Sequence, residues 1–181
     1  MGKLGALWCS LLLLPLLSCT PPSFDNRLNS CRVERIYDGD TMTLNCNGEK
    51  TKVRFHCIDT PEMGQVSWGK KSRDHLRDIS PDRVDVIHLG TDRYGRVIGN
   101  VLDKAGDSLN LRMVREGYAA VYPQYCEEKE FFAAQGSARS QNLGIWKESG
   151  LHQQPWLWRK AQREEPSWIE TLWAWARGAL F

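Results

Sequence analysis

The chain has 181 residues, which is enough for one compact domain with extensions at either end. Hydrophobic residues make up 41% of the chain and charged residues 25%, a balance typical of globular proteins and unlike that of disordered ones. The formal net charge is only +2, and residues 31–146 carry equal numbers of basic and acidic side chains. This argues against a nucleic-acid binder that relies on a broad basic surface, so any such function must come from a local site.

The first 19 residues have the pattern of an export signal. An apolar run over residues 4–17 follows a single lysine, and it is too short to span a bilayer. The sequence Leu16-Leu17-Ser18-Cys19 resembles a bacterial lipobox, in which the cysteine becomes the lipidated N-terminus. Ordinary signal cleavage near Ser18 is the alternative. We therefore expect an exported protein, anchored through Cys19 in the bacterial cell envelope or otherwise periplasmic or extracellular.

Residues 20–30 are polar and Pro-rich, which predicts a flexible tether. The alternation of apolar and polar residues over 31–37 and again over 40–46 predicts two strands. Asp38-Gly39 between them is a strong signal for a two-residue hairpin turn.

The same turn predicts a disulfide. Cys31 and Cys46 lie at equal distances from the two turn residues, so a regular hairpin would place them opposite each other. A bulge would shift this register. The chain has six cysteines, and four remain if Cys9 is removed with the signal and Cys19 carries the lipid. Four cysteines in an oxidising compartment allow three connectivities, and their spacing contains no CxxC pair of the kind that binds zinc. We predict Cys31–Cys46, which leaves Cys57 with Cys126.

The remaining elements follow in the order strand, helix, strand, strand, helix, helix, at residues 51–58, 69–79, 83–89, 97–102, 108–116 and 127–142. Five strands interleaved with about three helices predict a mainly β, α+β domain. The natural candidate is an OB-fold, a five-stranded Greek-key barrel.

Three short segments carry candidate chemistry: Asp38-Gly39-Asp40-Thr41, then Arg54-x4-Asp59-Thr60-Pro61-Glu62, then Thr91-Asp92-Arg93-Tyr94-Gly95-Arg96. Singly they read as a hairpin turn, a helix start and a polar loop. In this order and at these separations they resemble the staphylococcal-nuclease-like (thermonuclease) family, over residues 31–146. Together with the export signal, the resemblance identifies the chain as a secreted or lipoprotein member from bacteria. It implies an OB-type barrel and a calcium-dependent endonuclease that cuts DNA and RNA and leaves 3′-phosphates.

The resemblance also implies a role for each matching position. Calcium would be held by the carboxylates of Asp40 and Asp59 and the backbone carbonyl of Thr60. Glu62 would act as general base on the attacking water, and Arg54 and Arg96 would bind the phosphate. Substrate contacts would come from Arg93, Tyr94, Tyr122 and Tyr125, the last two by stacking.

These residue types suit phosphodiester hydrolysis on chemical grounds as well. Calcium prefers oxygen ligands and polarises a phosphoryl oxygen. Two arginines can form forked hydrogen bonds that strengthen as charge develops on the phosphate, and lysine is no equivalent for either. Strict alternation places Arg54 and Asp59 on opposite faces of a strand. We therefore predict that the chain bulges or leaves the strand between them.

Residues 147–181 form a Trp-rich extension. The segment Gln154-Pro-Trp-Leu-Trp-Arg159 resembles a Pro-Trp-x-x-Arg segment that follows the domain in bacterial relatives, and we expect it to pack back onto the domain. Further on, helical spacing aligns Trp168, Leu172 and Trp175. This terminal helix could pack on the domain or could lie on a membrane surface or a partner protein.

The expected partners are DNA and RNA substrates and a membrane reached through the lipid anchor, and we expect a monomer. The alternative function is a nonenzymatic OB-fold module of the envelope that binds nucleic acid or protein. Such modules typically lose the carboxylates or arginines that are all present here.

Overall fold

The computed structural model describes residues 26–164. The predicted export signal with Cys19 and the terminal segment 166–181 lie outside the described residues, so both stay predictions. Within the described range no helix is both long enough and apolar enough to cross a membrane.

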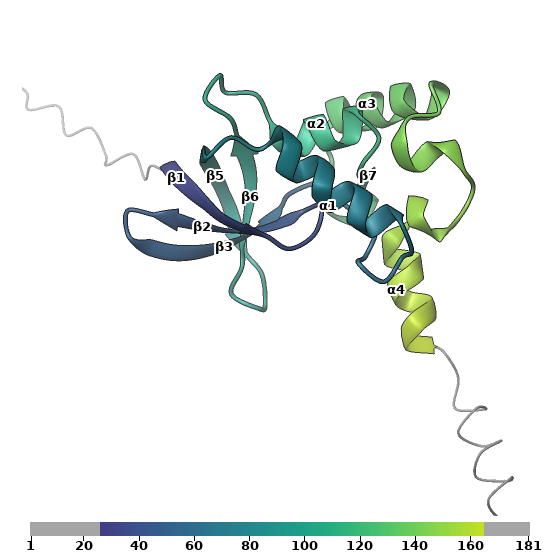
Figure 1. Ribbon diagram of the computed structural model, residues 1–181, viewed down its shortest axis with the longest axis horizontal. Coiled ribbons are helices and arrows are strands. Elements are labelled where there is room, and N and C mark those ends of the chain that lie inside the picture. The colour runs from purple at the N-terminus through teal and green to yellow at the C-terminus, as the bar shows by residue number, and fades with distance from the viewer. Residues whose placement is uncertain (1–25, 165–181) are drawn as a thin grey trace, which may run out of the picture.

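A closed five-stranded barrel forms one side of the molecule, as predicted (Figure 1). The strands run in the order β1-β2-β3-β6-β5, with β3 and β6 parallel and the other neighbouring pairs antiparallel. Their bounds are β1 Arg27–Ile36, β2 Thr41–Cys46, β3 Glu49–Phe55, β5 Arg83–Thr91 and β6 Val97–Leu102. Alternate residues such as Leu44, Val53 and Val86 are fully buried and fill the barrel interior.

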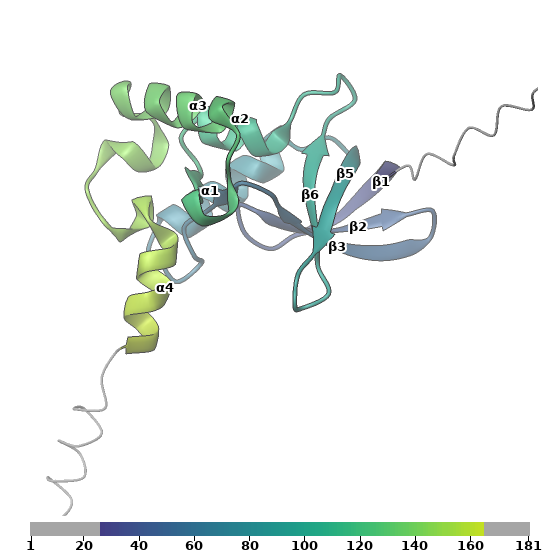
Figure 2. The same cartoon turned by 180° about the vertical axis from the view of Figure 1, so that it is seen from behind.

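Within the described residues four α-helices accompany the barrel: three correspond to the helices predicted for the domain, and the fourth lies in the extension that was expected to pack on it. They are α1 Trp68–Ile79, α2 Leu109–Arg115, α3 Lys129–Ser140 and α4 Pro155–Glu164, with short 3₁₀ turns η1 Pro123–Tyr125, η2 Gly144–Lys147 and η3 Leu151–Gln153. Ser108 caps α2 by accepting a hydrogen bond from the backbone N–H of Leu111 at 3.1 Å. Helices α2 and α3 lie beyond one end of the barrel, and α4 lies far from the start of β1 (Figures 1 and 2).

The predicted tether is wrong at its end, because β1 begins at Arg27. Leu28 pairs with Val86 of β5 and packs against the core, so residues 27–30 belong to the barrel. The proline-rich composition that suggested a tether stops before this point.

The hairpin turn differs from the prediction, yet the predicted disulfide forms. Tyr37 N–H donates to Thr41 O at 3.0 Å, which leaves three residues in the turn instead of two. A one-residue bulge in β1, between Val33 and Arg35, offsets the extra turn residue. The two irregularities cancel, and Cys31 is bonded to Cys46.

The third predicted strand ends between Arg54 and Asp59, where the sequence analysis predicted a break. β3 ends at Phe55, and Cys57 adopts a positive φ of 69° before the two-residue strand β4 (Ile58–Asp59) pairs with β7 (Ala120–Val121). This turn moves Asp59 out of the alternation of β3, as predicted. The Cys57–Cys126 disulfide ties the turn to the segment that precedes α3.

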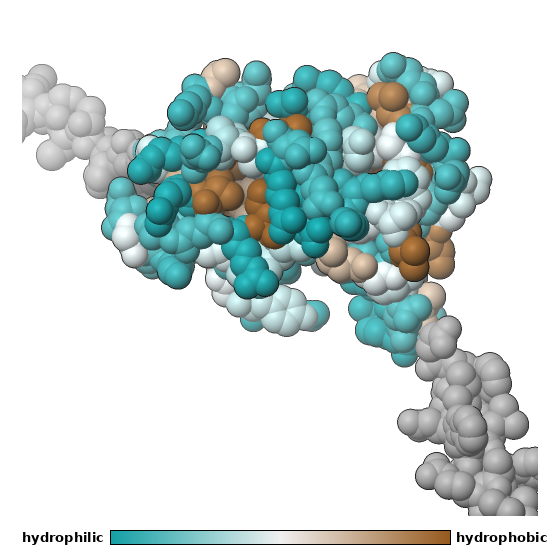
Figure 3. Space-filling model, viewed as in Figure 1, coloured by the Kyte–Doolittle hydropathy of each residue, from teal (hydrophilic) through white to brown (hydrophobic). Residues whose placement is uncertain are grey.

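A second cluster of buried residues lies between the helices and contains Trp68, Ala138, Ile145 and Trp146, with Trp156 of α4 packed against it. The extension therefore packs on the domain at least as far as α4. The face of the molecule in Figure 3 is mainly hydrophilic, with only scattered hydrophobic residues.

Candidate active site

One cleft of about 850 Å³ gathers the residues of all three sequence segments. The predicted residues that line it are Asp40, Arg54, Asp59, Thr60, Glu62, Arg93, Tyr94, Arg96, Tyr122 and Tyr125. Trp156, Arg159 and Arg163 of α4 also line it. The disulfide Cys31–Cys46 lies outside this lining, whereas Cys57 belongs to it.

The turn that carries Asp40 packs tightly on the segment after β4. A Cβ on Gly39 would lie 2.8 Å from Thr60 Cγ2, so only glycine allows this approach. As a result, Asp40 Oδ2 accepts hydrogen bonds from the backbone N–H and the hydroxyl of Thr60, each at 2.9 Å. Asp40 is 5% exposed, so its carboxylate is held in a fixed position within the protein.

Arg54 joins the two predicted calcium carboxylates. Its Nη1 lies 2.6 Å from Asp40 Oδ1 as an ion pair, and its Nη2 donates to Asp59 Oδ1 at 2.8 Å. Burial alone would lower the pKa of Arg54, but the attraction of Asp40 and Asp59 outweighs it and raises this pKa. Arg54 therefore stays charged and links the barrel to β4.

The acidic groups of the site repel one another. Burial first, and then the negative charge of Asp40, raise the pKa of Asp59 to about 6, although Arg159 and Arg54 act to lower it. Burial and Asp40 likewise raise the pKa of Asp38 to about 7. Asp40, Asp59 and Glu62 are paired with only two arginines, Arg54 and Arg159, so this inner group holds one excess negative charge, which favours an added cation.

Glu62 lies at the edge of the cleft, with its side chain 34% exposed. Its backbone N–H donates to Gln65 Oε1 at 2.8 Å, and its carbonyl accepts from Gln65 N–H at 2.8 Å. A Cβ on Gly69 would lie 2.1 Å from the Glu62 carbonyl oxygen, so glycine at the start of α1 is required for this close packing. The backbone of Glu62 is thus fixed while its side chain faces the cleft.

Arg96 is held separately from Arg54. Its Nε and Nη2 each lie 2.7 Å from Asp92 Oδ2, and Asp92 Oδ1 accepts from the backbone N–H groups of Tyr94 and Arg96. Arg93 Nη2 donates to the Tyr94 hydroxyl at 2.7 Å, and Tyr94 is 68% exposed. This loop lies at an open wall of the cleft, so its arginines are placed to meet a ligand that enters from solvent.

Aromatic rings form another wall. Tyr122 stacks on Trp156 with ring centres 5.3 Å apart, and Tyr125 meets Tyr122 edge to face at 4.8 Å. Tyr125 is 58% exposed. The two predicted stacking residues therefore lie together, but the face of Tyr122 is shared with α4.

Arg159 of α4 is a residue of the site to which the sequence assigned no role. Its Nη1 donates to Asp59 Oδ1 at 3.0 Å and to Glu62 Oε1 at 2.7 Å, and its Nη2 donates to Asp59 Oδ2 at 2.9 Å. The carboxylates raise the pKa of Arg159 against the opposing effect of burial. The Pro-Trp-x-x-Arg segment was the available signal, since it placed an arginine in a segment expected to pack on the domain.

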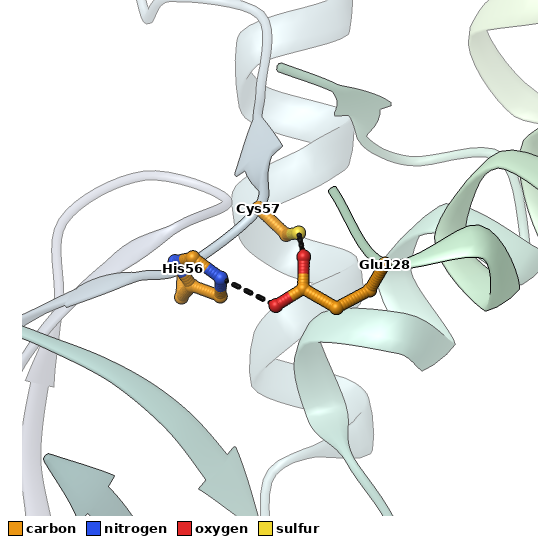
Figure 4. Close-up of side chains that lie close together, drawn as sticks. All are labelled: His56, Cys57 and Glu128. Carbon is orange, nitrogen blue, oxygen red and sulfur yellow. Dashed lines mark hydrogen bonds and ion pairs between the residues drawn. The ribbon is translucent and has the colours of Figure 1, made fainter. Parts of the chain in front are cut away.

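A second cluster, His56, Cys57 and Glu128, has the spacing of metal ligands but not the chemistry (Figure 4). Cys57 is bonded to Cys126, so it has no thiolate to offer a metal. His56 Nε2 lies 2.8 Å from Glu128 Oε1, and this pair secures the start of α3 against the turn after β3. Among the described residues, the carboxylates of Asp40 and Asp59 in the cleft are the better candidates to hold a cation.

Comparisons with known proteins agree with this geometry. A family model described as staphylococcal nuclease homologue matches residues 52–148. A protein of Haemophilus influenzae named uncharacterized endonuclease is 36% identical over 137 residues, which is 75% of this chain and 75% of that protein. Micrococcal nuclease of Shigella flexneri is 36% identical over 72% of this chain and 80% of its own length. Endonuclease YhcR of Bacillus subtilis is 33% identical over 79% of this chain but only 13% of its own length.

Proposed function

Because the chain belongs to the staphylococcal nuclease family, we propose that it is a calcium-dependent endonuclease that hydrolyses DNA and RNA and leaves 3′-phosphates. The observation that carries the proposal is the arrangement of Asp40, Arg54 and Asp59 as a buried, ion-paired group, with Glu62 at the rim of the same cleft. A structural ion pair would not need this mixture of buried and accessible charge beside an open cleft.

The residues present fit a calcium ion. Asp40 and Asp59 offer carboxylate oxygens, and Thr60, which follows Asp59 and is hydrogen-bonded to Asp40, would add a backbone carbonyl, so every donor is an oxygen. The pKa of Asp59 is raised first by burial and then by the negative charge of Asp40, and a divalent cation would offset both effects. When bound, calcium supplies Lewis-acid polarisation of a phosphoryl oxygen and stabilises the charge that develops there.

Side chains of the protein would accept the proton from water and bind the phosphate. Glu62 accepts a proton from the attacking water, and its accessible side chain suits that task. Arg54 and Arg96 donate to the equatorial oxygens of the phosphate, whose charge rises from one to two in the transition state. Arg96 would leave part of its contact with Asp92 to do so, or would reach the phosphate with its remaining N–H groups.

Substrate would be positioned by the cleft walls. Arg93 and Tyr94 lie on the exposed loop after β5 and can contact a neighbouring phosphate. Tyr125 offers an exposed ring on which a base could stack, whereas Tyr122 already stacks on Trp156. Because residues 31–146 carry no excess of basic charge, binding should depend on these local contacts.

The test is cleavage of plasmid DNA and of RNA by purified protein, in calcium and in chelator. Cleavage that requires calcium, and that Glu62→Gln reduces by about 100-fold or more, is expected. Glu127→Gln, an exposed change beside α3, is the matched control and should retain activity. Cleavage that persists in chelator would exclude the metal role, and binding without cleavage in any metal would favour the nonenzymatic OB-fold module.

We also propose that the chain is exported and anchored by lipid at Cys19, on the strength of Leu16-Leu17-Ser18-Cys19. In a bacterial host, the wild-type protein should fractionate with membranes, and Cys19→Ser should move it to the soluble fraction. If Cys19→Ser stays with the membranes, the lipid anchor is wrong, and deletion of residues 166–181 then tests the terminal segment.

A further inference from the structure

Helix α4 brings a charged group to the catalytic carboxylates from outside the region that the family model matches. Arg159 lies beyond residue 148, where that match ends, and 100 residues after Asp59 in the sequence. Its guanidinium forms a forked pair with both oxygens of Asp59, at 2.9 and 3.0 Å, and also donates to Glu62 at 2.7 Å. A forked arginine–carboxylate pair is strong and directional, so it fixes the positions of both partners.

α4 is held firmly enough to deliver this contact. Trp156 stacks on Tyr122, and the ring of Trp158 lies so close to Gly64 that a Cβ there would be 3.2 Å away. Just before the helix, His152 stacks on Trp68 with ring centres 5.2 Å apart. These contacts fix α4 to α1 and to the loop that carries Glu62.

The Glu62 side chain depends on Arg159 for its position. Its backbone is bonded to Gln65, but its carboxylate is partly exposed and lies near the negative charge of Asp59. Two carboxylates so placed repel each other, and an unrestrained glutamate would turn toward water. A single nitrogen of Arg159, Nη1, bonds to both of them and holds the pair together.

We propose that Arg159 is a positioning residue of the active site, which holds Glu62 beside Asp59 and shares Asp59 with the bound cation. This inference rests on the proposed function, because it assigns Glu62 to the water and Asp59 to calcium. The C-terminal extension is then part of the active site and not only a cover for the core.

Because Arg159 and a bound calcium ion would share Asp59, the arginine should also affect the affinity for calcium. Calcium binds carboxylate oxygens at about 2.3–2.6 Å and must compete with the guanidinium that contacts both oxygens of Asp59. Removal of the arginine takes away a positive charge and frees Asp59 Oδ2, while Oδ1 keeps its hydrogen bond from Arg54. Without Arg159, turnover should fall because Glu62 loses its position. Calcium affinity should rise because Asp59 loses a competing cation, so the two changes have opposite signs. General structural damage would weaken both.

The experiment compares Arg159→Met, Arg159→Lys and the matched control Lys160→Met. Lys160 is the next residue of α4, and its amino group is exposed and lies 3.8 Å from Glu164. We expect Arg159→Met to lower kcat roughly 10- to 100-fold because Glu62 is misplaced. KM for the nucleic acid should stay within about twofold, since substrate contacts are unchanged. Calorimetric titration without substrate should show calcium binding about tenfold tighter.

Arg159→Lys should recover part of the lost kcat, because an ammonium group can bridge the carboxylates but cannot form the fork. Lys160→Met should leave both kcat and calcium affinity unchanged. An Arg159→Met variant with normal kcat would overturn the proposal, and so would one in which calcium binding weakens together with kcat. If the wild-type protein cleaves no nucleic acid, the proposed function fails by itself. The calcium titration of Arg159→Met would still test whether Arg159 and calcium share Asp59, because unchanged calcium affinity would refute that sharing.

Discussion

Asp40 and Thr60 are joined by two hydrogen bonds, in which the amide and the hydroxyl of Thr60 both donate to Asp40 Oδ2 at 2.9 Å. The two residues are 20 positions apart and belong to different sequence segments. Their contact brings the β1–β2 turn against the residues that follow β4, and so assembles the acidic side of the cleft. The Asp40 carboxylate is thereby oriented by the fold itself.

Thr60→Val removes one of these bonds and keeps the shape of the side chain. Because Thr60 is buried and its acceptor is charged, we expect the free energy of unfolding to fall by about 1.5–3 kcal/mol. Urea unfolding measures this loss. Thr51→Val on the partly exposed strand β3 is the same chemical change and should cost no more than about 0.5 kcal/mol. Equal losses in the two variants would show that the hydrogen bond from the Thr60 hydroxyl to Asp40 adds no measurable free energy of unfolding.

Arg96→Lys should be nearly as damaging as Arg96→Ala. Asp92 orients the guanidinium through Nε and Nη2, and a lysine cannot reproduce that geometry or a forked bond to phosphate. We expect kcat/KM to fall roughly 100-fold in both variants, as when one donor to a developing oxyanion is lost. Arg115→Lys, an exposed change on α2, is the control. An Arg96→Lys variant with wild-type kinetics would mean that position 96 supplies charge alone.

Metal-free protein should lose stability as the pH rises from 5 to about 7.5. The pKa of Asp59 is raised to about 6 and that of Asp38 to about 7, chiefly by burial and by Asp40. Each group therefore binds its proton more tightly in the folded state than in the unfolded state. The stability that this provides is complete below the ordinary aspartate pKa and is lost as the pH passes the raised value.

Urea unfolding in chelator at the two pH values measures this change. Carboxyl groups with lowered pKa, such as Asp85 and Asp92, titrate below this window and do not mask the effect. Asp38→Asn should flatten the dependence, because only Asp59 is then left to titrate. Stability that increases from pH 5 to 7.5 would contradict the assigned pKa directions.

Much of the fold follows from local pattern, because alternation and turn residues indicate the five strands and the periodicity of apolar residues indicates the helices α1, α2 and α3. The break between Arg54 and Asp59 was also predictable, since the proposed chemistry requires both to face one site. The bulge in β1 was not, because it depends on how a three-residue turn closes against the rest of the barrel. The role of Arg159 could not be predicted either, because no periodicity connects it with Asp59 and only the packing of α4 brings the two residues together.

The two disulfides should differ in their contribution to stability and to activity. Cys57–Cys126 closes a loop of 69 residues and Cys31–Cys46 one of 15, so loss of the first should cost about 4 kcal/mol and loss of the second about 3 kcal/mol. Cys57 also lies at the turn between Arg54 and Asp59, so Cys57→Ser/Cys126→Ser should lower kcat, whereas Cys31→Ser/Cys46→Ser should leave it close to normal. Urea unfolding and cleavage assays on the two double variants measure both effects. If both pairs changed kcat equally, the turn at Cys57 would not be what aligns the two sides of the site.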